Sequence, residues 1–84
     1  MKKVKKRNPR AATAIDTYIA AQIRTRRIAF GLSQAALGEK LGVSFQQIQK
    51  YEGGTNRLSA ARLFELCRVL KVPLASMFER DPTL

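Results

Sequence analysis

The sequence predicts an all-α domain built from five short helices. Serines suited to helix N-caps precede three stretches in which apolar residues recur with helical spacing: Ser33, Ser44 and Ser59. Glycines that can end a helix follow two such stretches, at Gly31 and Gly42. With 84 residues and 45% hydrophobic content, the chain suffices for one small domain with a thin core.

The chain divides into a basic N-terminal arm (1–14), a folded domain (15–80) and a short tail (81–84). The arm is expected to be disordered when free, and it carries six basic side chains and no acid: Lys2, Lys3, Lys5, Lys6, Arg7 and Arg10. Its open interpretations are a solubilising tail and a segment that contacts phosphates or the minor groove of DNA.

The first helix is expected at about residues 17–30. Asp16 is its predicted N-cap, and Gly31 its predicted end. Ile19, Ile23 and Phe30 fall on one helical face, which predicts that this face is buried.

Residues 33–52 have the pattern of a helix-turn-helix. A helix beginning at Gln34 and ending near Gly42 precedes a second helix capped by Ser44. Gly38 indicates a close approach between the two helices, because its lack of a side chain otherwise costs roughly 1 kcal/mol of helix propensity. The apolar residues that can form one seam between the helices are Leu37, Leu41, Val43, Ile48 and Tyr51.

Two further helices complete the predicted domain. A fourth spans about residues 60–70, with an apolar face of Leu63, Leu66, Cys67 and Leu70. Pro73 is placed to begin a short fifth helix, which carries Leu74, Met77 and Phe78. These last three side chains form either a dimer interface or the closure of the core under the first helix.

Charge and composition restrict the function. Sixteen Lys and Arg against six acids give a net charge of +10, which indicates a polyanionic partner such as nucleic acid or an acidic membrane. The absence of histidine and the single Cys67 exclude a zinc site or disulfide within one chain, and favour a buried thiol over a redox sensor. The acidic residues do not form a pair of the kind that an enzyme would use, so an enzyme is not expected. No apolar run is long enough to span a membrane and no signal peptide is evident, so a cytoplasmic protein is expected.

The outer face of the second helix of the helix-turn-helix carries side chains that can read DNA bases. These are Phe45, Gln46, Gln47, Gln49 and Lys50. Gln46 and Lys50 share a face because they lie four residues apart, and Gln and Lys can bond adenine and guanine edges. Gln47 has a second interpretation, because Ser44 and Gln47 have capping-box spacing.

The chain resembles the lambda-repressor-like, or Cro/XRE-type, family of bacterial and phage DNA-binding domains over residues 15–78. The resemblance lies in GLSQAALGEKLGVSFQQIQKYEGG and in the flanking IAAQIRTRR and LSAARLFELCRVLKVPLASMF, while FQQIQKYEGGTNR is also similar to small regulators of alphaproteobacteria. It implies base reading by Phe45, Gln46 and Lys50, although Phe45 departs from the usual polar residue. Phe45 would contact a thymine methyl, or else the partner subunit or the arm.

The resemblance also implies an ion pair within the domain and a set of contacts with DNA phosphates. It implies an ion pair between Arg27 and Glu52 that fixes the first helix to the recognition helix. The candidates for phosphate contacts are Ser33, Gln34, Lys40, Ser44, Asn56 and Arg57, of which Lys40 is equally explained by the helix dipole.

The sequence therefore predicts a transcriptional regulator, most simply a repressor, that binds double-stranded DNA as a homodimer on a two-fold operator. Two alternatives remain: an antitoxin that also binds a small protein partner, and a protein-bridging coactivator on the same fold. No metal, cofactor, membrane or small-molecule ligand is expected, and the protein is expected to associate with the bacterial nucleoid.

Overall fold

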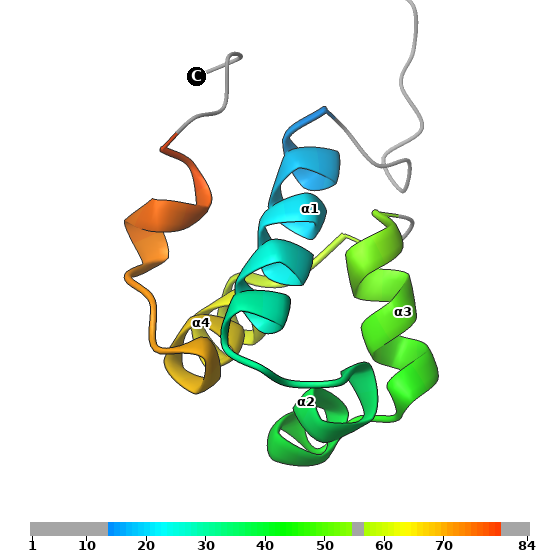
Figure 1. Ribbon diagram of the computed structural model, residues 1–84. Coiled ribbons are helices and arrows are strands. Elements are labelled where there is room, and N and C mark those ends of the chain that lie inside the picture. Colours follow the sequence, from blue (N-terminus) through cyan, green and yellow to red (C-terminus); the bar gives the residue numbers. More distant parts are fainter. Residues whose placement is uncertain (1–13, 55–56, 80–84) are drawn as a thin grey trace, which may run out of the picture.

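The computed structural model describes residues 14–54 and 57–79. In this part of the chain there are four α-helices, one 3-10 turn and no strand (Figure 1). The elements are α1 (Ala14–Ala29), α2 (Gln34–Leu41), α3 (Phe45–Gly53), α4 (Ala60–Leu70) and η1 (Leu74–Met77). The all-α prediction is confirmed. Asn56, most of the arm and the tail lie outside the described residues.

The prediction of a fifth α-helix is wrong, because Leu74–Met77 forms a single 3-10 turn. The Ser76 N–H donates to the Pro73 carbonyl at 3.0 Å, and the Phe78 N–H donates to Ala75 at 3.0 Å. The Ser76 hydroxyl also donates to Pro73, at 2.7 Å. These bonds span three residues, so they form the tighter helix that proteins use in short pieces.

The first helix begins and ends earlier than predicted. It starts at Ala14, so Asp16 lies within its first turn and is not the N-cap. It ends at Ala29, because Gly31 adopts a left-handed conformation with φ of 80°. The chain turns away there, so Phe30 leaves the apolar face and is 43% exposed, while Leu32 packs against the core.

The helix-turn-helix forms with the capping serines and the helix-ending glycine that the sequence predicts. The Ser33 hydroxyl accepts a hydrogen bond from the Ala36 N–H at 3.0 Å, and Gly42 ends α2 with φ of 78°. The Ser44 hydroxyl accepts from the Gln47 N–H at 3.1 Å and starts α3. Any side chain at position 38 would place its Cβ 2.7 Å from the Val43 carbonyl oxygen, so the tight corner requires Gly38.

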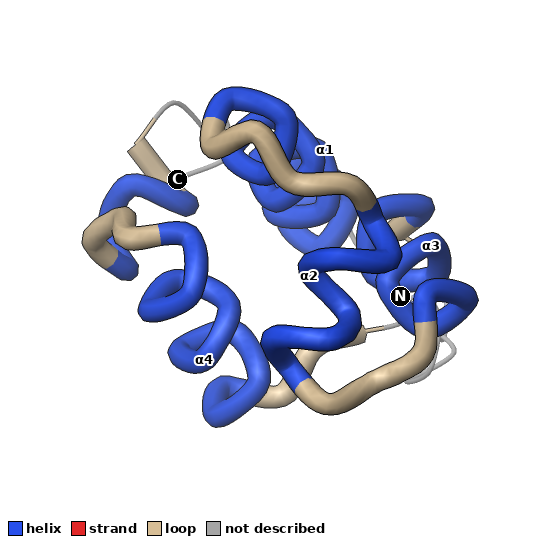
Figure 2. The backbone as a smooth tube through the Cα atoms, turned by 60° about the horizontal axis from the view of Figure 1, so that its bottom comes forward, coloured by secondary structure: helices blue, strands red, loops and turns tan. Residues whose placement is uncertain are grey.

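The core lies where α1, α2, α3 and α4 meet. Its fully buried side chains come from every helix and from η1: Ile23, Leu37, Ile48, Leu66 and Met77. Cys67 is part of this core, and its burial raises the pKa of the thiol. α2 packs against both α3 and α4 and lies between them (Figure 2). The outer sides of α3 and α4 are therefore separate surfaces of the domain.

Candidate nucleic-acid interface

One face of α3 is exposed and carries four of the five predicted base-reading residues. Phe45, Gln46, Gln49 and Lys50 are all exposed, and their spacing places them on one side of the helix. Ile48, on the opposite side, is fully buried. In Figure 1, α3 lies at the edge of the domain, so this face meets solvent.

Gln47 lies off that face and is only partly exposed. Its backbone N–H donates a hydrogen bond to the Ser44 hydroxyl, which forms the serine half of the capping box. This bond does not involve the Gln47 side-chain amide, so both interpretations of the Gln47 side chain stay predictions.

A buried ion pair anchors α3 to α1. The Arg27 guanidinium donates from Nε to Glu52 Oε2 at 2.6 Å and from Nη2 to Glu52 Oε1 at 3.1 Å. Both side chains are nearly buried, at 9% and 3% exposure. Arg27 Nη1 also donates to the Leu32 carbonyl at 2.8 Å, so one guanidinium joins α1, the following turn and the end of α3.

Gln34 joins the same network, which the sequence did not predict. Its Nε2 donates to Glu52 Oε1 at 3.1 Å. Because a carboxylate only accepts hydrogen bonds, this contact fixes which end of the Gln34 amide faces Glu52. Gln34 therefore has a set orientation at the start of α2, beside the phosphate candidate Ser33.

Arg57 is tied to α1 by a second ion pair that the sequence did not predict. Its Nε lies 3.2 Å from Asp16 Oδ2, and the two side chains are 44% and 16% exposed. Gly54, with φ of 72°, brings the preceding chain against α1, where an added Cβ would lie 3.5 Å from the Thr17 Cα. The candidate phosphate ligand beyond α3 is therefore positioned by the first turn of α1.

Lys40 lies late in α2, as the sequence predicts, whereas one residue of the predicted dimer interface does not lie at the surface. Lys40 is at the far end of α2 from Gln34, about 9 Å along the axis, and lines a pocket with residues of α4. The interface prediction is wrong for Met77, which is fully buried and closes the core. Phe78 is half-buried against that core, whereas Leu74 is 45% exposed.

Other kinds of site find no support in the described residues. Residues 14–54 and 57–79 contain no cluster of three or more side chains able to hold a metal ion. In the same part of the chain, no helix has both the length and the apolar character that crossing a membrane requires.

The capped α2–α3 corner and the buried anchor of α3 define a helix-turn-helix domain. Residues 23–77 match the helix-turn-helix family HTH_3, so the chain belongs to this family. It is 50% identical over 75 residues to an uncharacterized HTH-type transcriptional regulator of Sinorhizobium medicae, covering 89% of this chain and 54% of that one. A similarly described regulator of Rickettsia prowazekii is 40% identical over 65 residues, covering 77% and 50%. The chain thus spans about half the length of these relatives, both from alphaproteobacteria.

Solved structures show the same fold. The P22 c2 repressor, in complex with a synthetic operator, superimposes with a TM-score of 0.66 at 28% identity, over 75% of this chain and 96% of the repressor. The restriction-modification controller protein C.AhdI of Aeromonas hydrophila gives a TM-score of 0.73 at 24% identity, over 79% of this chain and all of that one. The latter likeness concerns the fold alone.

Proposed function

We propose that this chain is a sequence-specific double-stranded DNA-binding domain of a bacterial transcriptional regulator, with α3 in the major groove. The observation that carries the proposal is the exposed face of Phe45, Gln46, Gln49 and Lys50 on a helix held by a buried ion pair. A rigidly held helix presents its side chains at fixed positions, which base reading requires. The operator-bound P22 c2 repressor of the same fold supports this function.

The exposed side chains suit distinct bases. A glutamine amide can bond the adenine edge through two hydrogen bonds, and the Lys50 ammonium can donate to the acceptors of guanine. The Phe45 ring can pack on a thymine methyl. Each such contact discriminates against a wrong base by about 1–3 kcal/mol.

The phosphate contacts would bracket α3. Gln34 and Ser33 stand at the start of α2, where backbone N–H groups favour an anion. Ser44 caps α3 itself, while Asn56 and Arg57 follow it. The Ser33 and Ser44 oxygens already accept backbone N–H bonds, so each hydroxyl still has its own hydrogen to donate to a phosphate oxygen. The basic arm would add sequence-independent affinity.

We also propose that the protein acts as a homodimeric repressor on a two-fold operator in the cytoplasm. One domain of this size reads few base pairs, and two copies would meet half-sites ~34 Å apart. Leu74 is a large apolar side chain that is exposed within residues 71–79, which supports a role for this segment in pairing.

Selection of bound duplexes from a random DNA pool tests the proposal. The full chain is expected to enrich one sequence in two inverted copies, with half-site centres ~10 base pairs apart. The Gln46→Ala/Lys50→Ala double variant serves as the control and is expected to lose this enrichment while still binding DNA weakly. A pool that remains random with the unmodified chain would contradict sequence-specific binding, and an enriched site without symmetry would contradict the homodimer alone.

A further inference from the structure

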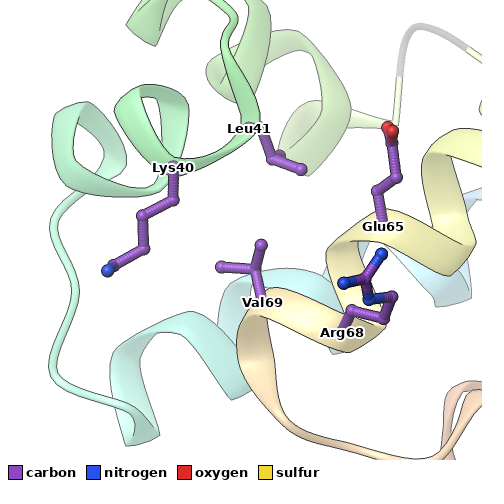
Figure 3. A pocket seen from close by; sticks show the side chains of 5 residues that line it. All are labelled: Lys40, Leu41, Glu65, Arg68 and Val69. Carbon is purple, nitrogen blue, oxygen red and sulfur yellow. The ribbon is translucent and has the colours of Figure 1, made fainter.

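A pocket lies between the C-terminal end of α2 and α4. Its lining comprises Lys40, Leu41, Glu65, Arg68 and Val69, and its volume is about 270 Å³. Figure 3 shows Leu41 and Val69 in the centre, with Lys40 on one side and Arg68 and Glu65 on the other. Small-molecule sites usually measure about 300–1,000 Å³, so this pocket suits a peptide side chain better than a cofactor.

The charges of the pocket are unbalanced in favour of the cations. The Glu65 carboxylate already accepts a hydrogen bond from Arg62 Nη1 at 3.0 Å. Within the described residues, neither Lys40 nor Arg68 has a carboxylate partner. In Figure 3 the Lys40 ammonium points away from Leu41 and Val69, so a ligand would pair with Lys40 and Arg68 through two separate carboxylates, one on each side of the apolar centre.

The pocket also offers apolar surface. Leu41 and Val69 are only partly buried, so a ligand can contact them. Outside the lining, Phe64 of α4 is 54% exposed, and the guanidinium of the lining residue Arg68 lies 5.9 Å from the centre of its ring. Paired aromatic and arginine side chains are typical of the residues that dominate binding energy at protein interfaces.

The position of the pocket separates it from the reading face. Because α2 lies between α3 and α4, a ligand in the pocket does not approach the exposed face of α3 (Figure 2). A second copy of this chain is a poor occupant, since symmetric pairing would set the Lys40 and Arg68 cations of both copies against each other.

We propose that this pocket binds an acidic segment of another protein. Carboxylates of that segment would pair separately with Lys40 and Arg68 on either side, and an aliphatic side chain between them would pack on Leu41 and Val69. The surface would let the domain hold a protein partner while α3 faces DNA.

Titration of the full ¹⁵N-labelled chain with a short capped peptide that repeats Asp-Asp-Leu tests the proposal. At moderate salt, the amide NMR shifts are expected to concentrate on residues 39–42 and 62–71. Arg68→Gln and Lys40→Gln should each weaken binding by up to about fivefold, the upper range for an exposed ion pair. The matched control is Arg24→Gln, which removes a charge from α1 that is also exposed. A peptide that repeats Asp-Asp-Ser should bind more weakly than the leucine peptide.

Three outcomes would overturn the proposal. Equal weakening by Arg24→Gln and Arg68→Gln would show attraction to the net positive charge alone. Shifts centred on α3 would place the acidic peptide on the reading face. Finally, if Arg68→Gln flattens the salt dependence of DNA binding by about one unit in the log–log slope, the pocket cations contact phosphate and not protein.

Discussion

The Arg27 guanidinium donates two hydrogen bonds to the Glu52 carboxylate, at 2.6 and 3.1 Å, and so fixes α3 to α1. The Gln34 amide bonds the same carboxylate. The start of α2 and the end of α3 therefore share one anchor. A change at this anchor is expected to move a phosphate candidate and the proposed base-reading face of α3 together.

Removing one partner of the ion pair is expected to be costly. Arg27→Met leaves the Glu52 carboxylate buried without its cation, and the free energy of unfolding should fall by about 3–5 kcal/mol. The Arg27→Met/Glu52→Leu double variant buries no charge and should recover most of this loss. Urea unfolding of the four proteins of this cycle measures the coupling. If the double variant lost as much free energy of unfolding as Arg27→Met and Glu52→Leu together, this would contradict a structural pair.

Gly38 is expected to resist substitution. Alanine would improve helix propensity by roughly 1 kcal/mol, but its Cβ would lie 2.7 Å from a backbone oxygen of the α2–α3 corner. Overpacking of this kind costs about 1–3 kcal/mol, so Gly38→Ala should destabilise the domain. Gly53→Ala is the matched control, because nothing lies within 4 Å of a Cβ built there. Thermal unfolding should show a lower midpoint for the first variant and an equal or higher midpoint for the second.

The stability of the domain is expected to decrease at alkaline pH through Cys67. Burial raises the pKa of its thiol above the ordinary value of 9.0, so the folded state disfavours the thiolate. The unfolded chain loses this proton first. Stability from this group is therefore complete below pH 9.0 and decreases as pH rises through the folded pKa. Cys67→Ala should show a shallower decrease between neutral and alkaline pH in urea unfolding, and parallel curves would contradict the assignment.

Arg57 is expected to contribute to DNA binding without selecting sequence. Arg57→Gln should flatten the slope of log affinity against log salt by about one unit, equally on specific and random duplexes. Arg62→Gln, which removes a charge from α4, is the control. Asp16→Asn should strengthen binding to all duplexes, because it removes the carboxylate that holds Arg57 at 3.2 Å. Fluorescence anisotropy over a salt series measures these changes, and an unchanged slope in Arg57→Gln would remove this residue from the interface.

Much of the fold could be predicted because its signals are local. A serine followed by helical apolar spacing, or a glycine in the left-handed conformation, acts within one turn of its own position. Ser33, Gly42, Ser44 and Ser59 therefore gave the correct bounds of α2 and the correct starts of α3 and α4. Helical spacing also placed Ile48 inside and Gln46 and Lys50 outside. The pairing of Arg27 with Glu52 came from the family resemblance, and spacing alone did not indicate it.

The remaining features depend on contacts between distant residues. Asp16 meets Arg57 across 41 positions, and Gln34 meets Glu52 across 18, so no local pattern reports either contact. Phe30 had the spacing of a buried residue, but the left-handed turn at Gly31 moved it out of the helix. Met77 and Leu74 belong to one short turn, and only the packing of η1 against α1 and α4 decides which of them is buried.

The most direct test of base reading by α3 is the affinity of Lys50→Ala for the selected operator and for its single-base-pair variants. The account predicts that the variant loses about 1–3 kcal/mol on the operator and no longer distinguishes the base pairs at one position of each half-site. Lys40→Ala, on the other side of α2, should keep the full preference. An equal loss on every duplex, including random DNA, would contradict the account and make Lys50 a backbone contact.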